Sequence, residues 1–418
     1  MTKTLSGRCF ASILVLFLLL FLAGCGQVSS SSRYAPTPPP VPKKWTIMMY
    51  LNGDEISMQQ DFIQAFHEIV DEGLGSTEQV NIVVQFDRYV YTPMPDFGGW
   101  TIAHRFYLQP GMEPTEQNAV SDWGDGRGGR EMDMADPAEL CAFINWAAAR
   151  YPAERNLLLI GDHGYGWQGL NIDMTSYGRF TALKGLREAL AGSPIRFDLL
   201  ALDACLMQMA EVAHELRGAG IGYLVGSENS GSTWPMAEIL KAVTQNPAIS
   251  APDLGRRIVD LYHEAHHGQQ TITLSLLDMG RIPSLSEAVL ALNTAMLAGL
   301  AFPAIQDKAQ AVMTAIEGAV IYVRNSPDRA DDHGLSIYFS PPDPEGYIPA
   351  MFFYSYIAEV TSFAVDTCWR DVLYAYYMRN YPGIPDSRIY HIREAIQPFD
   401  NDKIDLYDFC ERIVHWQD

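Results

Sequence analysis

Two stretches of this sequence each place a reactive side chain just beyond an apolar run. The run at residues 156–160 leads to His163, and the run at residues 197–202 leads to Cys205. A thiol beside an imidazole is the minimal pair for nucleophilic catalysis, because the imidazole takes the thiol proton and the thiolate then attacks an electrophilic carbon. We therefore predict that Cys205 is a nucleophile and that His163 is its general base.

The residues around this pair suit the same chemistry. Glycines lie on both sides of His163, so the backbone there is able to approach a substrate closely. The N–H groups of Gly164 and Cys205 are the natural donors of an oxyanion hole. A helix predicted from Met207 to Arg217 would direct its positive end at the thiol and favour the thiolate.

The two apolar runs are interpreted as buried strands of an α/β fold, in which sites form beyond the carboxyl ends of parallel strands. Continuous apolar runs are typical of parallel strands that are covered on both faces, and they occur at 45–51, 80–86, 156–160, 197–202 and 223–225. Helical periodicity separates these runs at 56–72, 137–150, 183–190 and 207–217. The pattern predicts an open, mostly parallel sheet sandwiched by helices, followed by mainly helical residues 237–330, a strand at 334–339 and a helical C-terminal region.

Four blocks of the chain resemble the clostripain family of cysteine peptidases and occur in that family's order. They are a first strand at 45–56, a histidine region at 131–169, a nucleophile region with its Asp-Ala-Cys at 196–216, and a late strand at 333–340. The resemblance spans residues 45–379 and implies a caspase-like fold. It also implies a Cys-His dyad that cleaves peptide bonds, so the chain is expected to be a cysteine-type endopeptidase.

The resemblance further implies a preference for Arg or Lys before the scissile bond. The matching acidic residue is Asp203, at the base of the first specificity pocket, where a carboxylate pairs with a guanidinium or ammonium group. The alternative role for an Asp at a strand end is to cap the following turn or helix. The expected partners are polypeptide substrates that contain Arg or Lys. The family's first strand usually continues Asn-Ala-Asp-Asn-Asn-Leu, and this chain departs from it after Asp54, where Glu55 follows.

Some members of the family are activated by internal cleavage between the histidine and the cysteine. Four basic residues fall in that interval here: Arg179, Lys184, Arg187 and Arg196. No cofactor and no metal ligands are predicted. Calcium dependence is known in part of the family, but the sequence shows no calcium loop, because the fragment at 400–402 begins like an EF-hand loop and lacks the required Gly and Glu.

The chain opens with the features of a bacterial lipoprotein signal. Residues 1–24 hold a basic start and a short apolar run, and the motif ending at Cys25 resembles a lipobox, which implies lipidation of that cysteine. The alternative is an ordinary signal peptide cut nearby. Residues 25–44 are rich in Ser and Pro, which predicts a tether. We therefore expect an exported, lipid-anchored protein of the bacterial cell envelope, with a peptidase domain at 45–345 and a mainly helical C-terminal region at 346–418.

Two other functions fit parts of the sequence. His263, Glu264 and His267 form an HExxH pattern, which is typical of zinc peptidases, although Gly268 indicates that the helix ends there. A non-catalytic surface lipoprotein that uses the caspase-like fold for binding is the other alternative. The formal net charge of −21 disfavours nucleic acid as a partner.

The remaining cysteines and acids receive structural interpretations. Cys141 lies among apolar residues of a predicted helix and is expected in the core. Cys368 and Cys410 show no metal-binding spacing and are expected to be buried or paired. His333 has no nucleophile beside it and is predicted to be structural. Asp162 neighbours His163 on a strand, where adjacent side chains point to opposite faces, so it is not expected to orient the imidazole.

Overall fold

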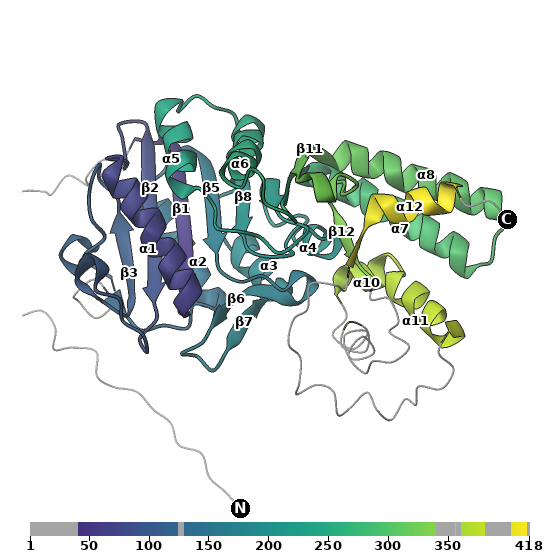
Figure 1. The fold of residues 1–418 in the computed structure, drawn as a ribbon, viewed down its shortest axis with the longest axis horizontal. Coiled ribbons are helices and arrows are strands. Elements are labelled where there is room, and N and C mark those ends of the chain that lie inside the picture. Colours follow the sequence, from purple (N-terminus) through teal and green to yellow (C-terminus); the bar gives the residue numbers. More distant parts are fainter. Residues whose placement is uncertain (1–40, 124–128, 340–355, 357–360, 381–402, 416–418) are drawn as a thin grey trace, which may run out of the picture. The chain divides into compact units, whose positions relative to one another are not determined.

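Figure 1 shows the fold as a computed structural model, which describes residues 41–123, 129–339, 356, 361–380 and 403–415. The signal sequence, Cys25, the tether as far as residue 40 and the acidic fragment at 400–402 lie outside these residues. The described residues belong to one unit that extends from Pro40 to Asp418. Among them, no helix is both long and apolar enough to cross a membrane.

A nine-stranded sheet forms the centre of the described residues, in the order β11-β10-β9-β8-β5-β1-β2-β3-β4. Its middle strands run parallel: β9 (Ile221–Gly226), β8 (Phe197–Asp203), β5 (Ala153–Gly161), β1 (Lys43–Gly53) and β2 (Val80–Arg88). Antiparallel strands flank them: β10 (Thr273–Asp278), β11 (Val320–Asn325), β3 (Ala103–Tyr107) and β4 (Gly129–Arg130). The predicted open, mostly parallel α/β sheet is therefore confirmed.

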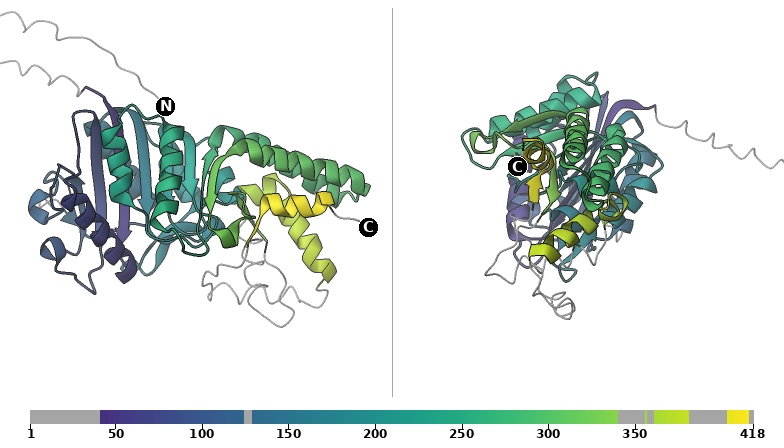
Figure 2. Two further views of the ribbon diagram at one scale, coloured as in Figure 1. Left: turned by 45° about the horizontal axis from the view of Figure 1, so that its top comes forward. Right: turned by 90° about the vertical axis from the view of Figure 1, so that its right-hand side faces the viewer.

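Two apolar cores cover the two faces of the sheet, because successive side chains of a strand point to opposite faces. On β1, Met48 and Tyr50 belong to one core, while Ile47 and Met49 belong to the other, and all four are buried. One face is covered by α1 (Ile56–Asp71), α5 (Met236–Gln245) and α6 (Ala251–Ala265). The other is covered by α2 (Pro137–Arg150), α3 (Leu183–Ala191) and α4 (Ala210–Glu215) (Figures 1 and 2).

The remaining described elements lie outside the central sheet. Two small sheets are formed by the hairpin of β6 (Gly169–Asp173) with β7 (Arg179–Ala182), and by β12 (Ser336–Tyr338) with β13 (Lys403–Asp405). The additional helices are α7 (Ile282–Leu297), α8 (Phe302–Ala319), α10 (Ser362–Asp366), α11 (Trp369–Asn380) and α12 (Leu406–His415). Helix α12 packs against α8, so the last described residues contact the body of the fold.

Residues 237–330 are mainly helical, as predicted, but they also contain β10 and β11, which were not predicted and which extend the sheet beyond β9. One local prediction was wrong. The helix predicted from Met207 to Arg217 is reduced to the six residues of α4, since the residues before Ala210 make other hydrogen bonds.

Candidate active site

The pairing of β5 with β8 brings the two predicted reactive residues to one edge of the sheet. These strands are parallel neighbours, and Gly161 at the end of β5 is paired with Asp203 at the end of β8. The N–H of Asp162 donates to the carbonyl of Asp203 at 3.1 Å, which continues the ladder by one step. His163 and Cys205 each lie two residues beyond their paired positions, and both are partly exposed.

Gly164 lies directly against the backbone of Cys205. A Cβ atom at Gly164 would stand 2.1 Å from the carbonyl oxygen of Cys205 and 2.8 Å from its nitrogen. No real side chain fits at such distances, so glycine is required for the two loops to meet. The contact brings together the two residues whose N–H groups were predicted to form an oxyanion hole.

The nucleophile loop, which joins β8 to α4 and carries Cys205, is held by the segment after β9. Leu206 has a left-handed backbone (φ 63°), and its N–H donates to the carbonyl of Asn229 at 3.1 Å. Gln208 donates in the same way to Ser227 at 3.0 Å. The N–H of Gly231 donates to Cys205 Sγ at 3.2 Å. The predicted stabilisation of the thiolate by a helix end is therefore wrong, because α4 begins at Ala210, and a backbone amide contacts the sulfur instead.

The backbone of His163 is fixed on both sides. Its N–H donates to Asp162 Oδ1 at 2.5 Å, and its carbonyl accepts from the N–H of Asn171 at 3.0 Å. Asp162 is in turn held by Asn52, whose Nδ2 donates to Asp162 Oδ2 at 2.8 Å. Burial raises the pKa of Asp162 well above its ordinary value, although these hydrogen bonds lower it in part. Asp162 thus positions the backbone of the histidine.

The imidazole faces a carboxylate that the sequence analysis did not select. Glu55 Oε2 lies 3.6 Å from His163 Nε2, and the two side chains are 25% and 35% exposed, respectively. Burial alone would raise the pKa of Glu55, but hydrogen bonds from Ser57 and Met58 and the nearby imidazole lower it. The one signal in the sequence was that the chain departs from the clostripain pattern at this position.

Asp203 is a buried acid whose charge is poorly compensated. Its side chain is 6% exposed, and Oδ2 has no hydrogen-bond partner within the described residues. Burial raises its pKa well above the ordinary value, the charge of Asp61 raises it further, and the N–H of Trp234 lowers it in part. Thr233, next to Trp234, donates to Asp61 Oδ2 at 2.8 Å. The carboxyl groups of Asp203 and Asp61 therefore contact neighbouring residues of the same loop, Trp234 and Thr233.

Comparison with known proteins identifies the family. The model of the clostripain family matches residues 49–418. The chain belongs to the clostripain family. By this membership it is classed as a cysteine-type endopeptidase, a hydrolase, as the sequence predicted.

Relatives of this family resemble the chain in part of its sequence or in its fold. Clostripain from Hathewaya histolytica, a curated relative, is 30% identical over 107 residues, which are 22% of this chain and 20% of clostripain. The matched region thus spans about a fifth of clostripain. A secreted C11 cysteine protease from Bacteroides thetaiotaomicron, in complex with an irreversible peptide inhibitor, is 17% identical with a TM-score of 0.58, over 78% of this chain and 99% of that one. An inactive zymogen C11 protease from Parabacteroides distasonis is 18% identical with a TM-score of 0.52, over 73% and 88% of the two chains. These likenesses show the shared caspase-like fold.

The zinc-peptidase alternative does not agree with the clostripain fold of the chain. Helix α6 ends at Ala265, so His267 lies beyond it, and His263 Nε2 is 3.3 Å from the carbonyl oxygen of Asn325. In the part of the chain that the structure describes, no group of three or more His, Cys, Asp or Glu side chains could hold a metal ion. The second histidine of the HExxH pattern therefore lies outside the helix that carries the first, unlike in the zinc-peptidase motif.

The surroundings of the other cysteines and of His333 indicate structural roles. Cys141 packs against the core and is partly buried, and burial raises the pKa of the Cys410 thiol. No disulfide joins the four cysteines that the structure describes. His333 Nδ1 lies 3.3 Å from Asp405, and its ring stacks on Tyr407.

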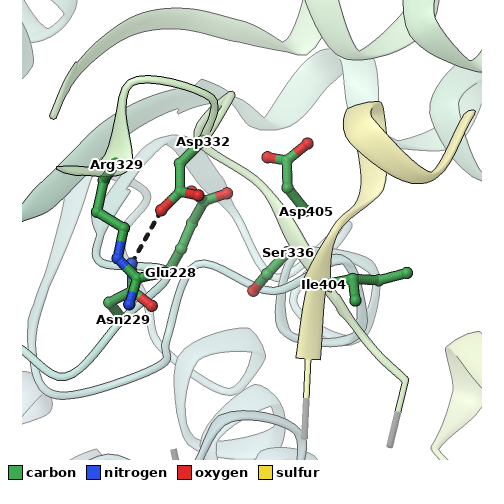
Figure 3. A pocket seen from close by; sticks show the side chains of 7 residues that line it. All are labelled: Glu228, Asn229, Arg329, Asp332, Ser336, Ile404 and Asp405. Atoms are coloured by element: carbon green, nitrogen blue, oxygen red, sulfur yellow. Dashed lines mark hydrogen bonds between the residues drawn. The ribbon is translucent and has the colours of Figure 1, made fainter. Parts of the chain in front are cut away.

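A small polar cavity lies behind the nucleophile loop, and Figure 3 shows its lining. Its volume is about 60 Å³, and it is lined by Glu228, Asn229, Arg329, Asp332, Ser336, Ile404 and Asp405. Asn229 Nδ2 donates to Asp332 Oδ2 at 2.9 Å, while the carbonyl of Asn229 accepts from the nucleophile loop. The cavity has room for a few water molecules.

Proposed function

We propose that the chain hydrolyses peptide bonds that follow Arg or Lys, with Cys205 as nucleophile and His163 as general base. The observation that carries the proposal is the pairing of Gly161 with Asp203 on adjacent parallel strands. This pairing supports the proposal, because His163 and Cys205 follow neighbouring strand ends at the edge where open α/β sheets build their sites. Family membership supplies the reaction class, and this geometry supports the residues.

The proposed reaction uses two proton transfers at His163. The imidazole takes the proton of the Cys205 thiol, and the sulfur attacks the carbonyl carbon of the scissile bond. The oxyanion that forms is bound by the N–H groups of Gly164 and Cys205. The leaving amine receives the proton from His163, and a water molecule then hydrolyses the thioester to release the acid product.

Asp203 is proposed to bind the basic side chain of the substrate. Its Oδ2 is buried without a hydrogen-bond partner, so a guanidinium or ammonium group would supply the missing contact. The raised pKa of Asp203 has a consequence for binding. A cation beside the carboxyl group lowers its pKa again, so binding of a basic side chain favours the ionised form of Asp203.

The location and cofactor requirements are proposed from the sequence. Residues 1–24 would be removed, Cys25 would carry lipid, and the segment from Cys25 to the start of β1 would tether the peptidase to a bacterial membrane. Metabolic labelling with a fatty-acid analogue tests this, since a Cys25→Ala chain should incorporate no label. We propose that no cofactor is needed, so a chelator of calcium should leave turnover unchanged.

Turnover of peptide–coumarin substrates by the chain from Pro40 to Asp418 tests the activity. The Arg and Lys substrates should be cleaved and an Asp substrate should not, and Cys205→Ala should abolish cleavage. An active Cys205→Ala variant would show that the nucleophile is elsewhere. Inactivity toward all basic substrates, with and without calcium and after nicking with trypsin, would favour the non-catalytic binding function.

A further inference from the structure

Glu55 lies at the sheet edge that carries the proposed dyad. Strand β1 pairs with β5 in parallel register, with Leu51 opposite Gly161. The chain leaves β1 at Gly53 and begins α1 at Ile56, so Glu55 belongs to the short connection above the strand ends. This connection places the side chain of Glu55 beside His163.

Hydrogen bonds to the helix that follows hold the Glu55 carboxylate in place. Glu55 is the N-cap of α1, with extended backbone angles (φ −152°, ψ 161°). Its Oε1 accepts from the N–H groups of Ser57 and Met58, and its Oε2 accepts from Ser57 Oγ at 2.9 Å. A glutamate is an unusual cap, because Ser, Thr, Asp and Asn are preferred there. The longer side chain reaches further from the helix than a preferred cap would.

The Glu55 side chain extends to the imidazole ring of His163. Glu55 Oε2 lies 3.6 Å from His163 Nε2, which is the distance of an ion pair and slightly longer than a hydrogen bond. The backbone of His163 is fixed by hydrogen bonds with Asp162 and Asn171, so rotation of the ring is the motion that is left. A carboxylate at Nε2 favours the proton on that nitrogen and leaves Nδ1 as the basic atom.

The other titratable groups around the ring are Asp162, Tyr165 and the proposed nucleophile Cys205. Burial raises the pKa of Asp162 well above its ordinary value and raises the pKa of Tyr165 to about 12. The pKa of Glu55 is lowered instead, so Glu55 supplies the ionised carboxylate beside the imidazole.

We propose that Glu55 is a positioning residue for the dyad. Glu55 orients His163 through Nε2 and stabilises the imidazolium that forms when the thiol proton is transferred to His163. This inference rests on the proposed roles of His163 and Cys205. It adds a third side chain to the dyad, at the position where this chain departs from the family's usual first-strand sequence.

The variant Glu55→Gln tests the proposal in the full chain, because Gln keeps the cap acceptor and removes the charge. The pair is partly exposed, so solvent screening limits the effect to about three- to tenfold. We expect kcat to fall by that factor with KM within twofold. The alkaline limb of the pH–rate profile should move to lower pH in Glu55→Gln, since a carboxylate 3.6 Å from the ring favours the charged imidazole.

A second readout does not depend on turnover. At neutral pH, alkylation of Cys205 by iodoacetamide, followed by mass spectrometry of its peptide, should slow three- to tenfold in Glu55→Gln, because less thiolate–imidazolium pair is present. Glu68→Gln, an exposed change further along α1, is the matched control and should alter neither readout.

The outcomes separate this inference from the proposed function. An unmoved alkaline limb and an unchanged alkylation rate would overturn the role of Glu55, even if the wild-type chain is fully active. A lower melting temperature with both readouts unchanged would also overturn it, since that pattern shows a helix cap alone. A wild-type chain that cleaves nothing contradicts the proposed function, while slower alkylation of Cys205 in Glu55→Gln would still support the role of Glu55.

Discussion

Replacing Asp203 by Asn should make the protein more stable and less active at the same time. Folding places this acid in an environment that raises its pKa, so the folded chain holds the proton up to a higher pH than the unfolded chain does. Each tenfold change in the ionisation constant corresponds to about 1.4 kcal/mol. Asn does not ionise, so its burial does not carry this cost of a shifted ionisation. We therefore expect Asp203→Asn to raise the free energy of unfolding at pH 7 by about 1.4 kcal/mol or more.

The increase in the free energy of unfolding of Asp203→Asn should depend on pH, in a direction that follows from the raised pKa of Asp203. Below the pKa of an unfolded Asp, about 3.9, both states hold the proton and the variant gains nothing. As the pH rises above that value, the unfolded state releases its proton before the folded state does, so the stability gained by the variant grows until the pH passes the raised pKa of the folded state. Urea unfolding at pH 5 and pH 8 measures this, and the stabilisation should be larger at pH 8.

Activity toward basic substrates should change in the opposite direction. Removing one partner of a buried charged pair costs about 2–5 kcal/mol, which is roughly 30-fold to several thousand-fold in kcat/KM for an Arg substrate. Alkylation of Cys205 should be unaffected. Asp307→Asn, an exposed change on α8, is the matched control and should change neither stability nor kinetics. A variant that is no more stable at pH 8 than at pH 5, or that cleaves Arg substrates at the wild-type rate, would refute this account of Asp203.

Two further changes follow from the geometry around the site. Gly164→Ala would place a Cβ 2.1 Å from the carbonyl oxygen of Cys205, so kcat should fall at least about 100-fold. The control Gly318→Ala, at a position with open space around it, should leave activity unchanged. Equal activities of the two variants would contradict the close approach of Gly164 to Cys205. Among the four basic residues between His163 and Cys205, Arg179 begins β7 after an exposed turn at Tyr177, while Lys184 and Arg187 lie within α3 and Arg196 directly precedes β8. Self-processing should therefore yield a new N-terminus at Phe180, and Arg179→Gln should leave the chain intact; N-terminal sequencing that finds a different cut would argue against this site.

The sequence predicted the parts of the fold whose apolar pattern is local. The strands before His163 and Cys205 are continuous apolar runs because both faces of the sheet are covered, so the two reactive residues could be assigned to strand ends. β10 was missed because Thr273 and Ser275 interrupt its apolar pattern, and β11 because it follows α8 without a turn residue.

The parts of the site that were missed depend on contacts between segments far apart in the chain. The helix predicted from Met207 is shortened because Asn229 and Ser227 take the backbone N–H groups of the nucleophile loop. The approach of Glu55 to His163 depends on the register of β1 with β5, which no local pattern of residues encodes. Propensity and periodicity describe neighbours along the chain, and tertiary contacts override them here.

The nucleophile loop also depends on segments that lie far beyond it in the sequence. Ser336 at the start of β12 donates its N–H to the carbonyl of Gln208 at 3.0 Å, and β12 pairs with β13, which ends at Asp405. Contacts between segments that are distant in the sequence form late in folding, because a long loop must close before they can be made. The loop that carries Cys205 therefore gains this support only after the central strands that lead to it have paired.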